Sequence, residues 1–198
     1  MIVVGLTGGI GSGKTTISKC FESYRIPVYI ADVEAKALMN RSKVIKRKLI
    51  KLFGEFAYKD EILNRPFLAS KIFTDKELLL KMNAIVHPKV ASHFKRWLKK
   101  QDSPYIIKEV AIIFENNLEK QYDYIITVVA DEDLRIERVM KRDDASKEKI
   151  VSIIKNQLPD DEKIKKSDFV ITNNDLDTAK SQAEEIHHQI LQIINKKD

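Results

Sequence analysis

A glycine-rich segment near the N-terminus contains the residues whose types and spacing point most directly to chemistry. Residues 8–15 read Gly-Gly-Ile-Gly-Ser-Gly-Lys-Thr and follow the apolar run at residues 2–6. This is the full phosphate-loop pattern, a glycine and four residues followed by Gly-Lys-Thr, between an expected strand and an expected helix. The sequence therefore predicts a site for a nucleoside triphosphate and a divalent metal ion.

Each residue type in this loop has a physical reason to be there. Glycines let the backbone approach phosphate oxygens and turn successive N–H groups into one hollow, and the helix that follows adds the positive end of its dipole. Lys14 can reach the β- and γ-phosphates, and the Thr15 hydroxyl can ligate Mg²⁺. We expect the nucleotide to be bound by Gly9, Ile10, Gly11, Ser12, Gly13, Lys14, Thr15 and Thr16.

Composition narrows the class of protein. With 198 residues, 43% of them hydrophobic, the chain can form one domain or a core with small insertions, and no apolar run approaches the roughly 20 residues needed to span a bilayer. A single cysteine, Cys20, and the absence of a basic segment ahead of Ile2 indicate a cytoplasmic protein. The net charge of +6 fits small phosphorylated ligands, because no basic arm with interleaved aromatic residues suggests nucleic acid. We expect neither a nucleic-acid nor a membrane partner.

Apolar runs and helical spacing alternate along the chain, which indicates a parallel α/β sheet. Strands are predicted at residues 2–6, 28–31, 105–110 with an extension over 111–114, 124–130 and 168–172. Helices are predicted at 14–24, 34–53, 66–72, 76–86, 88–100, 134–140, 147–158 and 175–195. The long helical stretch between the second and third strands is larger than an ordinary crossover, so we expect it to recognise a substrate.

Ligands in such sheets lie beyond the carboxyl ends of the strands, where this chain carries Asp32. Its carboxylate could accept a proton from an attacking hydroxyl or orient Mg²⁺ through water, but it could equally cap the helix expected from Glu34. His87 precedes Pro88, and from the residues alone it is better read as part of a corner between two helices.

Three arginines, Arg135, Arg138 and Arg142, are spaced three and four residues apart and should share one helix face. That face could be solvated, with Glu132 and Glu137 as partners. It could also be a mobile arm that brings guanidinium groups onto a transferring phosphate, which is the reading we favour beside a phosphate loop.

Taken together, these segments resemble the dephospho-coenzyme A kinase family over nearly the whole chain, to about Asn174. The phosphate loop alone is shared by many kinases, but its leading Leu6-Thr7-Gly8-Gly9-Ile10 and the later pieces in this order are more specific. The later pieces are Ala31-Asp32, Ile72-Phe73, Val86-His87-Pro88, Ile112-Ile113-Phe114-Glu115, Arg135 to Arg138 with Arg142-Asp143, Gln157 and Asn173-Asn174.

The resemblance implies an α/β fold: a three-layer P-loop core with a five-stranded parallel sheet, a helical domain for coenzyme A and a small helical lid. The core would comprise residues 1–32, 104–133 and 159–198, the helical substrate domain 33–103 and the lid 134–158. The implied reaction moves the γ-phosphoryl group of ATP to the ribose 3′-hydroxyl of dephospho-coenzyme A, the last step of coenzyme A synthesis.

The resemblance also implies site residues. Asp32 would act as the catalytic carboxylate. Arg138 and Arg142 would contribute to catalysis from the lid, and Lys14 would do so from the phosphate loop. Arg65, His87, Phe114 and Glu115 would lie on the acceptor side, and Asn174 would lie near adenine. The expected partner is the small-molecule acceptor, with the protein a monomer or a weak homo-oligomer.

The chain departs from the family pattern at several positions. Ile30 stands where the family usually has the first aspartate of Asp-Ala-Asp, Lys71 where an arginine often precedes Ile-Phe, and Ala111 where a proline is common. Asp32 aligns with the aspartate of the family pattern that is thought to be catalytic, so its role is kept with one carboxylate. A lysine at position 71 weakens any bidentate phosphate contact there. An arginine often found after Gln157 is missing, so that part of the lid carries no assignment.

Two other functions are compatible with the residues. One is a kinase for a different small hydroxyl, such as a nucleoside or a nucleotide. The other is a nucleotide-dependent switch or binding module, although the Asn-Lys-x-Asp pattern expected of a guanine-reading switch does not occur.

Overall fold

The computed structural model describes residues 1–196, with every side chain among them except that of Thr74. The chain forms two compact units: Met1–Tyr29 with Asp102–Asp198, and Ile30–Gln101. Each unit has its own hydrophobic core.

The main sheet is five-stranded, in the order β2-β5-β1-β6-β7. Its strands are β1 (Ile2–Thr7), β2 (Val28–Ile30), β5 (Tyr105–Glu109), β6 (Tyr124–Val129) and β7 (Phe169–Thr172). The pairings of β1 with β5, β1 with β6 and β6 with β7 are parallel, with Val4 of β1 opposite both Ile107 and Tyr124. The predicted fold class, an α/β core on a five-stranded parallel sheet, is therefore confirmed.

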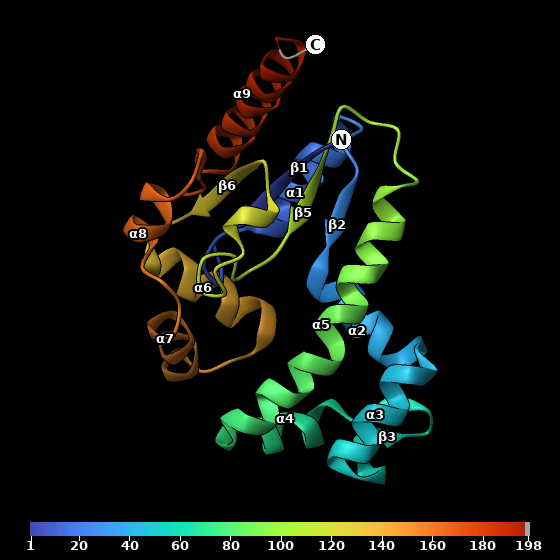
Figure 1. Ribbon diagram of the computed structural model, residues 1–198. Helices are drawn as coiled ribbons and strands as arrows, with labels where there is room; N and C mark the ends of the chain where they lie inside the picture. The colour runs from blue at the N-terminus through green and yellow to red at the C-terminus, as the bar shows by residue number, and fades with distance from the viewer. Residues whose placement is uncertain (197–198) are drawn as a thin grey trace. The chain divides into compact units, whose positions relative to one another are not determined.

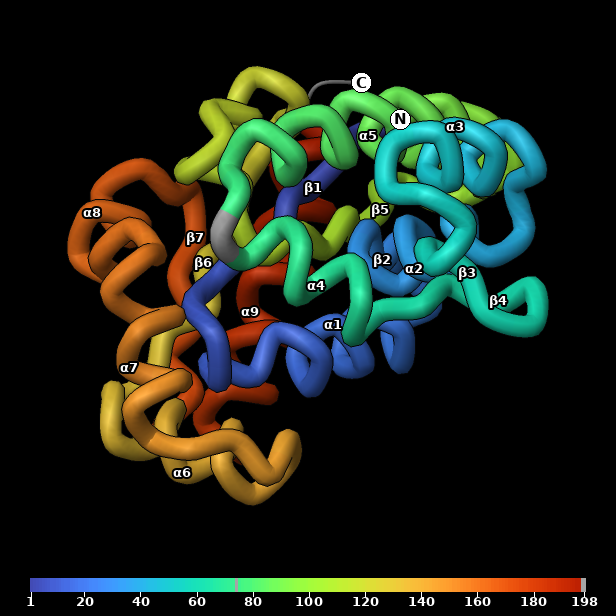
Figure 2. Tube along the Cα trace, turned by 90° about the horizontal axis from the view of Figure 1, so that it is seen from below, coloured from blue at the N-terminus to red at the C-terminus, as the bar shows by residue number. Residues whose placement is uncertain are grey.

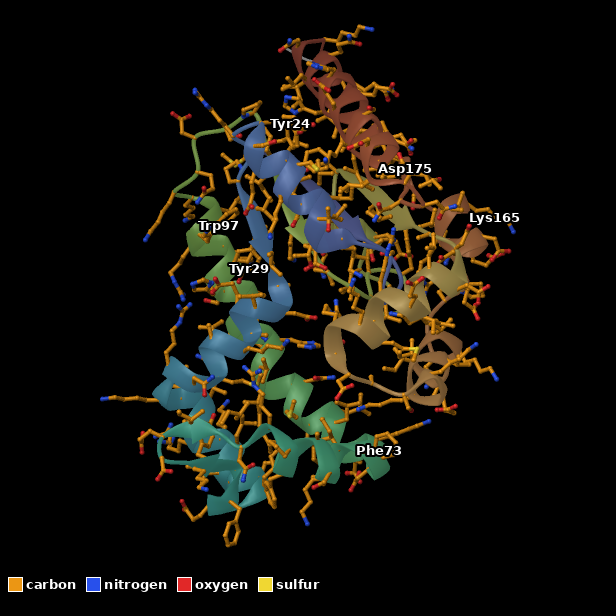
Figure 3. The ribbon with its side chains drawn as sticks, turned by 180° about the vertical axis from the view of Figure 1, so that it is seen from behind. Tyr24, Tyr29, Phe73, Trp97, Lys165 and Asp175 are labelled. Atoms are coloured by element: carbon orange, nitrogen blue, oxygen red, sulfur yellow. The ribbon has the colours of Figure 1, made fainter. Side chains whose placement is uncertain are left out.

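The α-helices that accompany this sheet within the described part of the first unit are α1 (Lys14–Ser23), α6 (Glu132–Asp143), α7 (Lys147–Lys155), α8 (Asp160–Lys165) and α9 (Leu176–Asn195), and a short 3₁₀ helix lies at Glu119–Gln121. Helices α1 and α9 pack against β1, β5, β6 and β7 through fully buried side chains such as Leu6, Ile17, Phe21 and Ile126. Asp175 caps α9, with its Oδ1 accepting from the Thr178 amide at 2.8 Å, and Figure 3 labels it at the start of that helix. This packing fixes the strand β1 and helix α1 on either side of the phosphate loop.

The second unit is helical, with α2 (Ala31–Arg41), α3 (Lys43–Phe53), α4 (Arg65–Thr74) and α5 (Lys76–Leu98). A small antiparallel hairpin, β3 (Tyr58–Lys59) with β4 (Ile62–Leu63), follows a short 3₁₀ helix at Glu55–Ala57. Its core includes Leu38, Ile45, Leu49 and Leu68. Burial raises the pKa of Tyr58 to about 12, so its hydroxyl stays protonated and donates to the Met39 carbonyl at 2.6 Å.

Several predicted elements of this unit were wrong in detail. The helix expected over 34–53 is two helices, because Ser42 is extended and caps α3 by accepting from the Ile45 amide. The expected corner at His87-Pro88 does not exist, since α5 runs through Pro88 without a break in its assignment. The hairpin was not predicted, because each of its strands is only two residues long.

Two predictions around strand ends also need correction. Helix α2 begins at Ala31 rather than near Glu34, so Asp32 lies inside its first turn and does not cap it. A carboxylate there still interacts favourably with the helix dipole. The strand extension predicted over 111–114 is a series of turns, in which Ile113 and Phe114 are buried in a small cluster with Ile125. Their apolar character reflects that burial rather than sheet pairing.

Candidate active site

The phosphate loop connects β1 to α1, and its backbone has the conformation that its glycines permit. Gly11 and Gly13 have φ values of 78° and 93°, in the left-handed region. Lys14 opens α1 and folds back over the loop, donating from Nζ to the carbonyl of Gly8 at 2.7 Å. The hydroxyl of Ser12 is buried without a hydrogen-bond partner among the described residues. A cation over a glycine backbone, beside an unused hydroxyl, fits the phosphates of a nucleotide.

Two side chains from the α6–α8 segment hold the backbone of Ile10, in the middle of the loop. Gln157 accepts from the Ile10 amide at 2.9 Å through Oε1, and Arg135 donates from Nε to the Ile10 carbonyl, also at 2.9 Å. Figure 2 shows α6 and α7 beside the loop that joins β1 to α1. The loop is thus fixed at its tip by residues more than 120 positions away in the sequence.

Arg135 is only 5% exposed and forms an ion pair with the half-buried Asp160, with Nη1 2.7 Å from Asp160 Oδ2. A Cβ added to Gly9 would lie 2.2 Å from Arg135 Nη2, and one added to Gly11 would lie 2.4 Å from the Arg135 carbonyl oxygen. These two glycines are therefore required for the packing of Arg135 as well as for the loop. The expectation that all three arginines share one face open to solvent or phosphate is wrong for Arg135, because it is used to hold the loop.

Asn173 and Asn174, which follow β7, reach the same region. Asn173 is 3% exposed and donates from Nδ2 to the Ser12 carbonyl at 2.7 Å. Arg138 donates in turn to the Asn173 carbonyl at 2.9 Å. The side-chain oxygen of Asn174 accepts from the Asp131 amide at 2.9 Å. The predicted residues Arg138 and Asn174 therefore lie in one network with the phosphate loop.

Arg142 lies near the end of α6 and is exposed. It makes two hydrogen bonds to Asp143, both 2.7 Å long. These bonds raise the pKa of Arg142 and lower the pKa of Asp143. Both groups are charged near neutral pH, so Arg142 would have to exchange this partner in order to meet a phosphate.

Glu115 and Phe114, predicted on the acceptor side, follow β5 in the first unit. Phe114 is 4% exposed. Glu115 is half-buried, and its Oε1 accepts from the Leu158 amide at 3.0 Å and lies 3.3 Å from Lys163 Nζ. The other carboxylate oxygen, Oε2, is buried without a hydrogen-bond partner among the described residues. Glu115 is therefore tied to the start of α8 on one side only.

The remaining predicted residues belong to the second unit. Asp32 is exposed in the first turn of α2, two residues after the end of β2. Arg65 is exposed at the start of α4, where Asn64 accepts from the Phe67 amide as the helix cap. His87 is exposed in the middle of α5. Within their own unit, all three side chains are open to solvent.

No group of three or more His, Cys, Asp and Glu side chains within residues 1–196 is arranged to hold a metal ion. Thr15, whose hydroxyl is predicted to ligate the metal, is exposed in the first turn of α1. In the part of the chain that the structure describes, no helix has the length and apolar character needed to cross a membrane.

Comparison with known proteins shows which family has this sequence. The family model for dephospho-CoA kinase matches residues 2–178. A dephospho-CoA kinase from Bacteroides fragilis is 39% identical over 174 residues, which is 87% of this chain and 85% of the relative. One from Fusobacterium nucleatum is 38% identical over 175 residues, or 88% and 90% of the two chains.

The chain belongs to the dephospho-CoA kinase family. Its function is ATP-dependent phosphorylation of dephospho-CoA in coenzyme A biosynthesis, as the sequence predicted. The fold is shared with a structure from Thermus thermophilus, which has a TM-score of 0.87 at 30% identity and covers 95% of this chain and 96% of its own. The dephospho-CoA kinase from Campylobacter jejuni shares the fold, with a TM-score of 0.68 at 22% identity over 95% and 96% of the two chains.

Some residues of the loop network of this enzyme were not assigned roles from the sequence. Gln157 and Asn173 stood in the motifs, but nothing in their spacing indicates that they bond to the loop backbone. Asp160 and Lys163 lie in a charged segment, residues 160–166, where the pattern gives no sign of which side chain is buried. Only the three-residue spacing of this pair on a helix could have suggested an ion pair.

Proposed function

We propose that residues Gly9 to Thr16 bind the triphosphate of ATP and that Asp32 receives the proton of the acceptor hydroxyl. The observation that carries the donor half is the loop itself, with the Lys14 ammonium on the Gly8 carbonyl and Ile10 held at both its amide and its carbonyl. The acceptor half rests on the family resemblance at Asp32, His87, Arg65, Phe114 and Glu115.

The reaction is an in-line displacement at the γ-phosphorus. The ribose 3′-oxygen forms a bond to phosphorus as its proton passes to the Asp32 carboxylate, and the bond from phosphorus to the β,γ-bridging oxygen breaks to release ADP. Positioning and charge stabilisation supply most of the acceleration in such transfers. Lys14 and the arginines Arg138 and Arg142 would carry the positive charge that stabilises the transferring group.

A divalent cation completes the proposal, with Thr15 as its protein ligand. When bound, Mg²⁺ neutralises charge on the β- and γ-phosphates. The donor set fits, because Mg²⁺ in phosphate-transfer sites takes few protein ligands and keeps water and phosphate oxygens for the rest.

We further propose a separate role for each of three parts of the chain. Residues 33–103 would bind the acceptor, residues 134–158 would act as a lid carrying the arginines, and Asn174 would lie near adenine. The lid would exclude water, which competes with the acceptor hydroxyl. We propose that the protein is cytoplasmic, works as a monomer or weak homo-oligomer, and binds no nucleic acid.

The experiment that tests the acceptor half compares Asp32→Asn with the wild type. If Asp32 is the base, the variant should keep its affinity for ATP while kcat falls by about 10²- to 10⁴-fold, the range for a lost general base. Asp60→Asn is the matched control: Asp60 is an exposed carboxylate of the same unit, in the β3–β4 turn with φ of 48°, a conformation that asparagine adopts well. Turnover of Asp32→Asn within threefold of the control would refute the assignment.

A further inference from the structure

A fully buried lysine lies outside the proposed catalytic residues. Lys163 on α8 is 0% exposed, and its Nζ lies 3.3 Å from Glu115 Oε1 and 3.8 Å from Asp160 Oδ1. Lys165, two positions further along the same helix, is mostly exposed and points outward in Figure 3. A buried ammonium is costly unless opposite charges surround it, so Lys163 needs both carboxylates.

Through these two carboxylates, Lys163 is connected to the phosphate loop. Asp160 accepts a 2.7 Å hydrogen bond from Arg135 through its second oxygen, and Arg135 donates to the Ile10 carbonyl. In the other direction, Glu115 accepts from the Leu158 amide, next to the Gln157 that accepts from the Ile10 amide. One end of the cluster therefore contacts Ile10 directly through Arg135, and the other end contacts the residue that follows Gln157 in the chain. We call these four side chains, Glu115, Lys163, Asp160 and Arg135, the loop brace.

The brace is incompletely bonded on the Glu115 side. Lys163 Nζ lies within ion-pair distance of Glu115 but has no hydrogen bond of good geometry among the described residues, and Glu115 Oε2 is also buried and unbonded. Buried polar groups are normally bonded, so two neighbouring exceptions identify the place where the cluster can rearrange. The Arg135 side, in contrast, has short, well-directed bonds to Asp160 and Ile10.

We propose that Arg135 and Lys163 are positioning residues for phosphoryl transfer, and that the brace couples acceptor binding at Glu115 to the phosphate loop. This inference rests on the proposed roles of the loop as the ATP site and of Glu115 on the acceptor side. A bound acceptor could draw the Glu115 carboxylate away from Lys163, or it could supply the missing hydrogen bond of Glu115 Oε2. Either change alters the electrostatic field at Asp160 and Arg135. The change reaches Ile10, where Arg135 fixes the backbone that faces the phosphates.

The test measures the affinity of a non-hydrolysable ATP analogue by calorimetry, with and without dephospho-CoA, for Lys163→Met and Arg135→Lys. Arg135→Lys keeps the positive charge but cannot donate to Ile10 and Asp160 together in the geometry of the guanidinium fork. We expect the analogue Kd to rise about tenfold in Arg135→Lys, and the effect of dephospho-CoA on that Kd to disappear in Lys163→Met. Lys165→Met is the matched control and should behave as the wild type.

A purely structural role would lower the melting temperature and leave these affinities unchanged. Analogue affinities within twofold of the wild type in both variants, with the response to dephospho-CoA intact, would overturn the proposal, and so would a wild-type Kd that dephospho-CoA leaves unchanged. If Lys163→Met shows no cooperative melting, Arg135→Lys decides, since an unchanged Kd in that variant also overturns it. The proposed function fails by a different result: no phosphorylated product from dephospho-CoA with the wild type.

Discussion

Replacing Gly13 with alanine should lower both the free energy of unfolding and the nucleotide affinity of this protein. Two causes contribute to the loss of stability: backbone conformation and a displaced side chain. Gly13 has φ of 93°, and a Cβ placed on it would lie 2.0 Å from Asn173 Nδ2. The left-handed conformation costs a non-glycine residue about 1–2 kcal/mol. The new methyl group must also displace the Asn173 side chain from the Ser12 carbonyl, a bond of 2.7 Å.

Loss of that buried bond adds about 1–3 kcal/mol, because both polar groups are left without partners. We therefore expect Gly13→Ala to lower the free energy of unfolding by roughly 2–5 kcal/mol. For a chain of this size that corresponds to a melting temperature lower by about 4–20 °C. Urea denaturation followed by circular dichroism measures the free energy, and calorimetry with a non-hydrolysable ATP analogue measures the affinity.

Two comparisons separate the causes. Gly54→Ala imposes a positive φ of 83° where a Cβ meets no described atom within 4 Å, so it should cost stability without changing nucleotide affinity. In an Asn173→Ala background, Gly13→Ala should cost only the conformational part, about 1–2 kcal/mol. An equal cost of Gly13→Ala in both backgrounds would refute the role given to the Asn173 contact.

Two further predictions concern charge. The Tyr105 hydroxyl and His187 Nδ1 are hydrogen-bonded at 2.6 Å, and burial followed by the proximity of His188 lowers the pKa of His187. The unfolded chain therefore binds this proton more readily, so stability should fall as the pH drops from about 6.5 through the folded pKa. His187→Gln should flatten that part of a pH series of melting temperatures, and an unchanged slope would count against it. If the Arg142 guanidinium contacts the transferring phosphate, Arg142→Gln should lower kcat by about 10²-fold or more. The control, Arg96→Gln, changes an exposed arginine and should leave kcat unchanged. Equal kcat values of the two variants in steady-state assays would exclude a catalytic role for Arg142.

The sequence was most informative where local pattern and final environment agree. The strands near residues 2–7, 124–129 and 169–172 were predicted because strands buried on both faces need continuous apolar runs, and the phosphate loop was predicted because few other functions require its glycines and lysine together. The run at 111–114 has the same apolar character but turns away from the sheet. Periodicity alone does not separate burial in a sheet from burial in a loop.

The site was less predictable, because its contacts join distant segments. Arg135 looked like Arg138 and Arg142 in sequence, yet its guanidinium is buried against Ile10 and Asp160. Lys163 lies close to the exposed Lys165 and Lys166 in and after a six-residue helix, and only the fold places Glu115 beside it. Residues that are required for charge pairing between distant segments leave no pattern in the sequence. Residues that are required by the local backbone conformation, such as Gly11 and Gly13, form a recognisable motif.

We propose that this loop holds the ATP whose γ-phosphoryl group is transferred to dephospho-CoA. The direct measurement is ADP release with dephospho-CoA present and absent, in wild type and in Lys14→Met, with mass spectrometry of the acceptor. We expect ADP release that depends on dephospho-CoA, an acceptor heavier by one phosphoryl group, and loss of both in the variant. Acceptor-independent ADP release, or faster transfer to a nucleoside than to dephospho-CoA, would contradict this proposal.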